Sequence, residues 1–168
     1  DELRSKGEDI TLVYGDDANP ENSRSVILDK EPDRIYGFGH GSEMRYTVQY
    51  VEPFFTADGL NLDLVKNRII HLLSCLCARQ LGPTINEVDA RVFYGYAEDF
   101  TFMIISDVKP CACRYMTACF QGDLEIERLF AAGIIDYHTV FERAIARYND
   151  EITYWEEHYD DERCNGST

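Results

Sequence analysis

The sequence has few basic residues and no long apolar run. Its 16 lysine and arginine residues stand against 31 aspartate and glutamate residues, which gives a formal net charge of −15. Such a chain repels phosphate groups, so we expect neither nucleic acid nor a membrane as a partner. No stretch reaches the ~18 consecutive apolar residues that a membrane span needs. An acidic surface suits a basic peptide or protein substrate, although it also keeps proteins soluble without marking any partner.

Proline, tryptophan and methionine are scarce as well, and no internal repeat or low-complexity stretch interrupts the chain. Apolar residues nevertheless make up 45% and aromatic residues 12% of the 168 positions. A chain of this length and composition buries a core, so we expect one domain over residues 1–160. The acidic end, residues 161–168, is expected to be a disordered tail. The chain begins with Asp1 and not with Met, so we leave open that it is a piece of a longer protein.

The cysteines number six and lie at positions 75, 77, 111, 113, 119 and 164. A chain of this size does not need a disulfide framework, and pairs of the form Cys-x-Cys are awkward to bridge. No signal peptide is recognisable. We therefore expect mostly free thiols in a reducing compartment and a cytoplasmic location.

Strand-like and helix-like segments alternate along the chain. Apolar and β-branched runs predict strands over 10–14, 34–38, 68–73 and 90–96, with a fifth or a continuation over 100–105 and a strand or hairpin over 46–51. Capping residues and periodicity predict helices over 21–29, 61–65, 75–81, 110–132 with Gly122 as a kink or break, and 137–159. This alternation predicts an α/β fold with a mostly parallel sheet flanked by helices and a helical C-terminal segment.

Two of these strands end at reactive side chains. His40 follows the strand of residues 34–38 between two glycines, which permit a sharp turn and a close approach. Cys75 follows the strand of residues 68–73 and begins the expected helix of residues 75–81, whose N-terminus would lower the pKa of the thiol. In parallel sheets, ligands bind outside the carboxyl ends of the strands. A thiol and an imidazole at that edge are the minimum equipment for acyl transfer.

Taken alone, each of these residues also fits a purely structural role. His40 in a glycine-rich stretch also fits an ordinary turn, and a free cysteine usually fills space in a core. Cys77 is our candidate for such a structural thiol. The occurrence of His40 and Cys75 at matching strand ends favours function.

The pattern of an apolar strand, His40-Gly41, about 30 residues and a second strand ending in Ser74-Cys75 resembles the caspase-like cysteine peptidases, the clan that includes caspases, gingipains, clostripain and separase. The likeness is greatest to bacterial and archaeal domains with an HG/SC signature and to the gingipain branch. Leu81-Gly82-Pro83 and the strand ending at Tyr96 also look like the parts that follow the cysteine there. The resemblance covers residues 9 to about 105 and implies a caspase-like sheet.

The resemblance implies a role for each matching residue. Cys75 would be the nucleophile, His40 the acid that protonates the leaving amine, and the N–H groups of Gly41 and Cys75 the oxyanion hole. No cofactor and no third catalytic residue are implied. In the clostripain-like branch an aspartate at the position of Leu73 selects basic side chains, so that specificity is not carried over.

Other candidates carry less weight. Glu98 and Asp99 follow the fourth strand, where relatives line the substrate groove, and would attract a basic substrate side chain; a solvated loop is the favoured interpretation. The cysteine spacings match no usual zinc pattern. Gly37, Gly39 and Gly41 lack the spacing of a dinucleotide-binding loop.

The sequence thus predicts a cysteine endopeptidase, a thiol-dependent hydrolase. The alternatives left open are a catalytically inactive caspase-like module for binding or regulation and a thiol acyltransferase. In the former, the amphipathic terminal helix would dock a partner or a second copy in a homo-oligomer.

Overall fold

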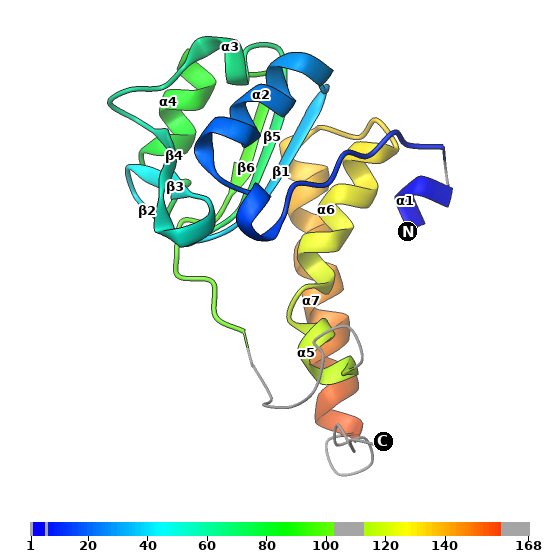
Figure 1. Ribbon diagram of the computed structural model, residues 1–168. Coiled ribbons are helices and arrows are strands. Elements are labelled where there is room, and N and C mark those ends of the chain that lie inside the picture. The colour runs from blue at the N-terminus through cyan, green and yellow to red at the C-terminus, as the bar shows by residue number, and fades with distance from the viewer. Residues whose placement is uncertain (1, 6, 103–112, 159–168) are drawn as a thin grey trace. The chain divides into compact units, whose positions relative to one another are not determined.

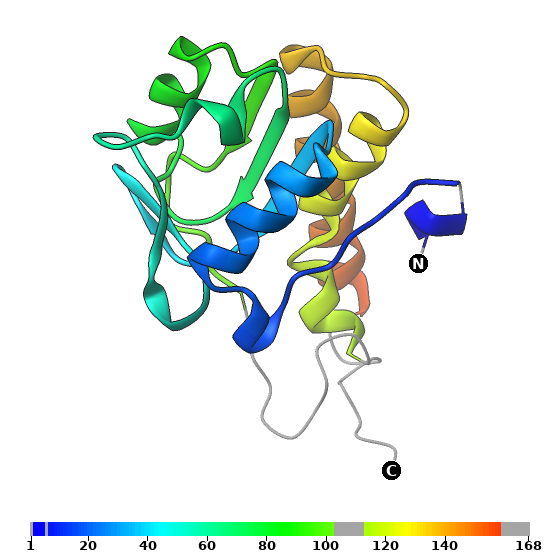
Figure 2. The same ribbon diagram turned by 45° about the horizontal axis from the view of Figure 1, so that its top comes forward.

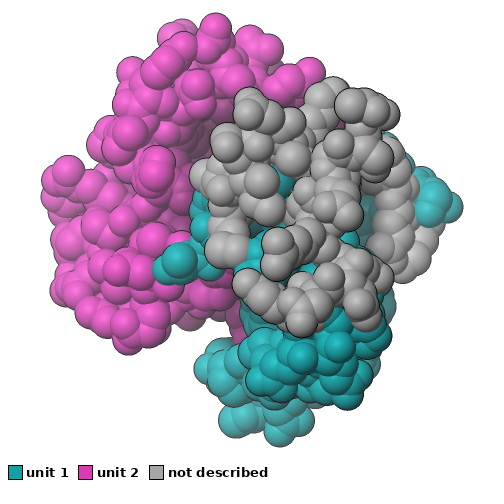
Figure 3. Space-filling view, turned by 90° about the horizontal axis from the view of Figure 1, so that it is seen from below, with its two compact units in different colours: residues 1–10, 101–168 teal, residues 11–100 magenta. Residues whose placement is uncertain are grey.

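The computed structural model describes residues 2–5, 7–102 and 113–158. The chain divides into two compact units, coloured separately in Figure 3. Residues 11–100 form unit 2, and residues 1–10 with 101–168 form unit 1. In the described part of the chain, no helix is long and apolar enough to cross a membrane.

A three-stranded parallel sheet forms the centre of unit 2 (Figure 1). Its strands, in the order β1-β5-β6, are β1 (Arg34–Phe38), β5 (Ile69–Leu73) and β6 (Val92–Gly95). The predicted strands over 34–38, 68–73 and 90–96 are confirmed to within a few residues, and so is the mixed α/β class. All five residues of β5 are buried, as expected for the central strand of a parallel sheet.

The helices of unit 2 and one face of this sheet enclose a single core. Ile70 and Leu72 of β5 pack there with Ile27 of α2 and with Leu81 and Ile85 of α4. Figures 1 and 2 show α2 in blue in front of the strands. The helices of this unit are α2 (Pro20–Lys30), α3 (Leu62–Val65) and α4 (Leu81–Glu87), with short 3-10 turns η1 (Gly15–Asp17) and η2 (Gln49–Val51).

The opposite face of the sheet carries a row of aromatic rings. Tyr36, His71 and Tyr94 are register partners on the three neighbouring strands. The ring centroids of Tyr36 and His71 lie 5.0 Å apart, and those of His71 and Tyr94 lie 5.9 Å apart. His71 is 1% exposed, so it belongs to the interior of the protein.

A second, antiparallel sheet lies between β1 and β5 in the sequence. Its three strands are β2 (Gly41–Ser42), β3 (Arg45–Thr47) and β4 (Pro53–Thr56). The strand or hairpin predicted over 46–51 corresponds to β3 and the turn that follows it. This sheet brings Tyr46 and Phe55 into the core of unit 2.

The strand predicted over residues 10–14 is wrong. These residues have no regular structure, and the side chains of Leu12 and Tyr14 are 62% and 78% exposed. A strand requires a neighbour for its backbone hydrogen bonds, and none pairs with this segment in the described structure. The strand predicted over 100–105 lies partly outside the described residues, and residues 100–102 are not a strand.

The regular elements in the described part of unit 1 are helices: α1 (Glu2–Ser5), α5 (Arg114–Ala118), α6 (Gln121–Ala131) and α7 (Tyr137–His158). The helix predicted over 110–132 is divided at Cys119 and Phe120, next to the expected break at Gly122; its first residues lie outside the described ranges. Gly122 lets α6 approach α7 closely, because a Cβ atom there would overlap the ring of Tyr148. The helix predicted over 137–159 is confirmed as α7.

The amphipathic terminal helix, α7, buries only part of its apolar residues. Val140 and Ala144 are 0% and 4% exposed, whereas Phe141, Ile145 and Ile152 are 47%, 42% and 55% exposed. The helix therefore presents a second apolar face beside the one that packs in unit 1.

Candidate functional site

His40 and Cys75 follow neighbouring parallel strands, each at the same number of residues after the end of its strand. Phe38, the last residue of β1, is the register partner of Leu73, the last residue of β5. The Gly39 N–H donates to the Leu73 carbonyl oxygen at 3.3 Å and extends the ladder by one bond. His40 lies two residues beyond Phe38, and Cys75 lies two residues beyond Leu73. The expectation that these two residues follow parallel strands at one edge of a sheet is confirmed.

The main chain of His40 is fixed, and its side chain is exposed. The His40 carbonyl oxygen accepts hydrogen bonds from the Thr47 N–H at 2.9 Å and from the Thr47 hydroxyl at 3.1 Å. These bonds fasten the residue to β3 while the imidazole remains accessible to solvent. An exposed imidazole can exchange protons with a bound molecule and with water.

Gly41 brings residues 39–41, which we call the histidine loop, against residues 74–80, which we call the cysteine loop. A Cβ atom at Gly41 would overlap the Ser74 hydroxyl and would lie 2.8 Å from the Cys75 carbonyl oxygen. The Thr47–His40 bond makes the next pair, Gly41 and Tyr46, a non-hydrogen-bonded pair of the antiparallel ladder. The N–H of Gly41 therefore points away from β3, where it is available to another acceptor.

Cys75 does not begin a helix. Residues 75–80 form a turn, in which Leu76 has a φ of +60°, and α4 begins at Leu81. The helix predicted over 75–81 is wrong because Gly82 and Pro83 lie in the first turn of α4 instead of ending a helix. Proline is tolerated there, since the N–H groups of the first turn have no partner within the helix. The sulfur is consequently not at a helix N-terminus.

The loop after β6 supplies the main-chain contact of the Cys75 sulfur. The Phe100 N–H donates to Sγ at 3.4 Å. The same loop holds the turn by two further bonds: the Leu76 N–H donates to the Glu98 carbonyl oxygen at 3.3 Å, and the Ala78 N–H donates to that of Tyr96 at 3.0 Å. We call residues 96–100 the thiol loop. Its role was missed by sequence reasoning, because a backbone donor leaves no sequence signal.

Glu98 and Asp99, the predicted substrate-binding residues, lie in the thiol loop. The carboxylate of Glu98 pairs with Arg79 at 2.9 Å, and Asp99 is exposed. Arg79 also pairs with Glu43 at 3.1 Å. The hydrogen bonds to the two carboxylates raise the pKa of the guanidinium, and the bond to Glu43 has the larger effect. The structure thus places both residues near Cys75 but gives Glu98 an ion partner from this chain.

The other described cysteines differ from Cys75. Cys77 is buried, and burial raises the pKa of its thiol to about 11. Its Sγ–H donates to the Ser74 carbonyl oxygen at 3.2 Å, which fits the structural thiol that we expected. Cys119 is free and half-buried, whereas Cys113 is disulfide-bonded, an exception to the mostly free thiols that we expected. Among the residues that the structure describes, no group of three or more His, Cys, Asp or Glu side chains is suited to a metal ion.

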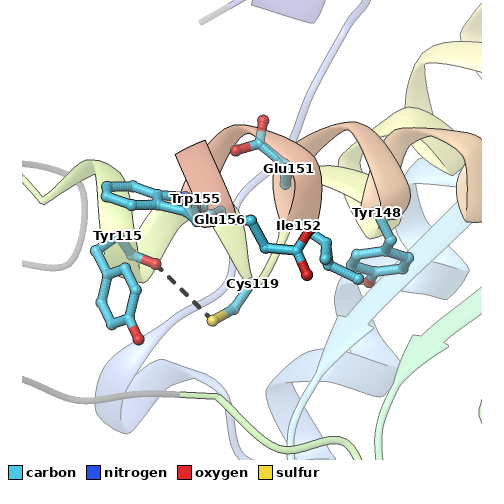
Figure 4. A pocket seen from close by; sticks show the side chains of 8 residues that line it. Tyr115, Cys119, Tyr148, Glu151, Ile152, Trp155 and Glu156 are labelled. Carbon is cyan, nitrogen blue, oxygen red and sulfur yellow. Dashed lines mark hydrogen bonds between the residues drawn. The ribbon is translucent and has the colours of Figure 1, made fainter. Parts of the chain in front are cut away.

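A cavity of about 460 Å³ lies elsewhere, in unit 1 (Figure 4). Its walls come from α5, from α7 and from the residue after α5: Tyr115, Ala118, Cys119, Tyr148, Glu151, Ile152, Trp155 and Glu156. Figure 4 shows the Cys119 sulfur directed toward the carbonyl oxygen of Tyr115, to which it donates at 3.9 Å. The cavity contains neither His40 nor Cys75, which belong to unit 2.

We compared the chain with protein families, curated proteins and solved structures. No family model matches the chain, and neither the curated proteins nor the solved structures compared with it gave a match.

Proposed function

We propose that this chain is a cysteine endopeptidase of the caspase-like kind, with Cys75 as nucleophile and His40 as general acid. One observation carries the proposal: the partnership of Phe38 and Leu73, which delivers both residues to the same edge of the sheet. A lone cysteine or histidine would support no such role. Two reactive groups that follow neighbouring strands at one edge support a role in nucleophilic catalysis.

The residues divide the reaction between them. The Cys75 thiol gives its proton to His40, and the sulfur attacks the carbonyl carbon of the scissile peptide bond. A C–S bond forms while the carbonyl oxygen takes up negative charge. The N–H groups of Gly41 and Cys75 are the donors proposed for that oxygen. When the C–N bond breaks, His40 gives a proton to the leaving amine. Water then attacks the thioester carbon, the C–S bond breaks, and one proton of the water passes to the sulfur, which releases the acid and restores the thiol.

The fit of Gly41 supports its part in this scheme. Its N–H is turned away from β3, and its Cα lies against Ser74 and Cys75. A glycine N–H can approach a developing oxyanion without a side chain in the way. The substrate class that we propose is a peptide or protein, since acyl transfer to water needs no cofactor from this chain.

A cleavage profile on a peptide library tests the proposal. Wild type, Cys75→Ala and the matched thiol control Cys119→Ala are compared with and without added Ca²⁺. We expect cleavage by wild type and by Cys119→Ala and none by Cys75→Ala. Cleavage that survives in Cys75→Ala, or no cleavage by wild type under any condition, contradicts the proposal.

The exposed apolar face of α7 favours a second candidate, a caspase-like module that binds a partner without cleaving it. Phe141, Ile145 and Ile152 are each more than two-fifths exposed. Exposed apolar faces of this kind often mark protein-binding surfaces. A wild-type chain that cleaves no peptide but associates through this face, with association lost in Phe141→Ser, would favour this candidate.

A further inference from the structure

The side chain of Arg79 joins two loops that both contact the Cys75 turn. Its Nη1 donates to Glu43 Oε1 at 3.1 Å, and its Nη2 donates to Glu98 Oε1 at 2.9 Å. Its Nε donates to the carbonyl oxygen of Ala97 at 2.6 Å. One planar guanidinium thus reaches three acceptors through its fork of N–H groups, which a lysine ammonium cannot reproduce.

Main-chain hydrogen bonds accompany this bridge. The Leu81 N–H donates to the Glu43 carbonyl oxygen at 2.8 Å, and the Leu76 N–H donates to that of Glu98 at 3.3 Å. The side chain of Gln80 adds a bond to Glu43 Oε2 at 3.1 Å. Every one of these contacts links residues 76–81 to the hairpin of β2 and β3 or to the thiol loop.

The two bridged loops carry the groups that contact the proposed nucleophile. Glu43 lies two residues after Gly41, whose main chain packs against Ser74 and Cys75. Glu98 lies two residues before Phe100, whose N–H donates to the Cys75 sulfur at 3.4 Å. A displacement of either glutamate would therefore be passed along the chain to the site within two residues.

We propose that Arg79 is a positioning residue, which holds the thiol loop closed over Cys75 and keeps Gly41 in register with it. The part of this inference that concerns catalytic turnover rests on the proposed function. The side chains of Arg79, Glu43 and Glu98 are 40%, 41% and 84% exposed. Because salt screens exposed ion pairs, closure of the loop weakens as ionic strength rises.

The rate of Cys75 alkylation by iodoacetamide at low and high sodium chloride tests the inference. Each thiol is followed separately by peptide mapping, and the buried Cys77 reports on the integrity of the fold. At low salt we expect Arg79→Gln to label Cys75 about fivefold faster than wild type, a change typical of losing exposed ion pairs. Added salt should accelerate wild type toward that rate and leave Arg79→Gln unchanged.

Four further variants sharpen the comparison: Arg79→Lys, Arg91→Gln, Glu98→Gln and the double variant of Arg79→Gln with Glu98→Gln. Arg79→Lys keeps the charge without the fork, so its labelling rate should fall between those of wild type and Arg79→Gln. Arg91→Gln removes an exposed arginine at the opposite end of β6 and should behave as wild type. In a double-mutant cycle, Arg79→Gln with Glu98→Gln should label no faster than the faster single variant, because both changes remove the same contact.

Measurement of kcat and KM distinguishes a positioning role of Arg79 from a purely structural one. We expect kcat for Cys75-dependent cleavage to fall about tenfold in Arg79→Gln, with KM changed less and kcat partly restored in Arg79→Lys, as for lost alignment of reacting groups.

The outcomes separate this inference from the peptidase proposal. Equal labelling of wild type and Arg79→Gln at low salt overturns the role of Arg79, whether or not the chain cleaves peptides. Parallel acceleration of Cys77 overturns it as well, because it indicates unfolding and not loop opening. Labelling that follows Arg79 in a chain that cleaves nothing supports loop closure and contradicts the peptidase.

Discussion

The main chain of Gly41 packs directly against the hydroxyl group of Ser74. A methyl group on Gly41 would overlap that hydroxyl, and it would also approach the Cys75 carbonyl oxygen to 2.8 Å. Ser74 is 2% exposed, and its oxygen has no hydrogen-bond partner among the described residues. This contact is the point where the histidine loop and the cysteine loop meet.

Gly41→Ala should damage both stability and activity. The added methyl group must displace Ser74 or the Cys75 carbonyl, and overpacking of this kind costs about 1–3 kcal/mol. Displacement of the proposed oxyanion donor should lower kcat about 100-fold. Urea unfolding and peptide cleavage measure the two effects. Gly59→Ala is the control, since the nearest atom to its Cβ is the Thr56 hydroxyl at 3.2 Å; equal effects of both variants would contradict the prediction.

Ser74→Ala should have the opposite effect on stability. A buried hydroxyl without a partner carries a desolvation cost, and its removal should raise the free energy of unfolding by about 1 kcal/mol. The smaller side chain should also relieve the clash in Gly41→Ala, so that the double variant is more stable than Gly41→Ala alone. Urea unfolding of the four proteins measures both effects. A Ser74→Ala chain less stable than wild type would show that the hydroxyl has a stabilising contact.

His40→Ala should remove activity and leave the fold intact. The imidazole is exposed, and the hydrogen bonds from Thr47 go to the main-chain carbonyl of His40, which alanine retains. Loss of a general acid lowers kcat by about 100-fold to 10,000-fold, while the free energy of unfolding should change by less than about 0.5 kcal/mol. His138→Ala, an exposed histidine of α7, is the matched control. Unchanged cleavage in His40→Ala would exclude the dyad.

Stability should fall in alkaline solution because of two buried groups in contact with the core. Burial raises the pKa of Cys77 from 9.0 to about 11 and that of Tyr46 from 10.0 to about 12. A raised pKa in the folded state means that the unfolded chain loses its proton first. The contribution of Cys77 is therefore complete below pH 9 and is lost between about pH 9 and 11, a change of about 3 kcal/mol.

Urea unfolding from pH 8 to pH 11 measures this loss, at values chosen around the pKa of about 11 for Cys77. Cys77→Ala should flatten the decline, even though the cavity it leaves lowers stability at every pH. Tyr14→Phe is the control, because Tyr14 is 78% exposed and should leave the pH dependence unchanged. An equally steep decline in Cys77→Ala would show that other groups cause it.

The elements that sequence patterns predicted well are those that local chemistry determines. Helix α2 begins where expected because the Asn19 side chain accepts a hydrogen bond from the Asn22 N–H and Pro20 occupies the first turn. Strands β1 and β5 follow from short apolar runs bounded by turn residues. The positions of His40 and Cys75 at one edge follow from parallel pairing of those two strands.

The turn after Cys75 could not be predicted in the same way. Leu76 takes a left-handed backbone conformation with a φ of +60°, which is uncommon for a bulky residue. Its N–H is bound to Glu98, 22 positions further along, and Arg79 reaches Glu43, 36 positions earlier. Local propensity favours a helix in this stretch, and contacts with distant loops overrule it. The segment at Leu12, whose side chain is 62% exposed, shows the converse, an apolar run without a strand partner among the described residues.

The pairing of Phe38 with Leu73 makes chain length, and not only residue identity, a determinant of the site. One inserted or deleted residue between Phe38 and His40 would turn the imidazole to the other side of the extended chain, since successive side chains alternate. Substitutions on the faces of β1 and β5 alter packing gradually, but a change in length at either strand end puts the two reactive groups at unequal distances from the paired residues. Natural variation in length should therefore concentrate in loops distant from this edge, such as the exposed turn at Asp58 and Gly59.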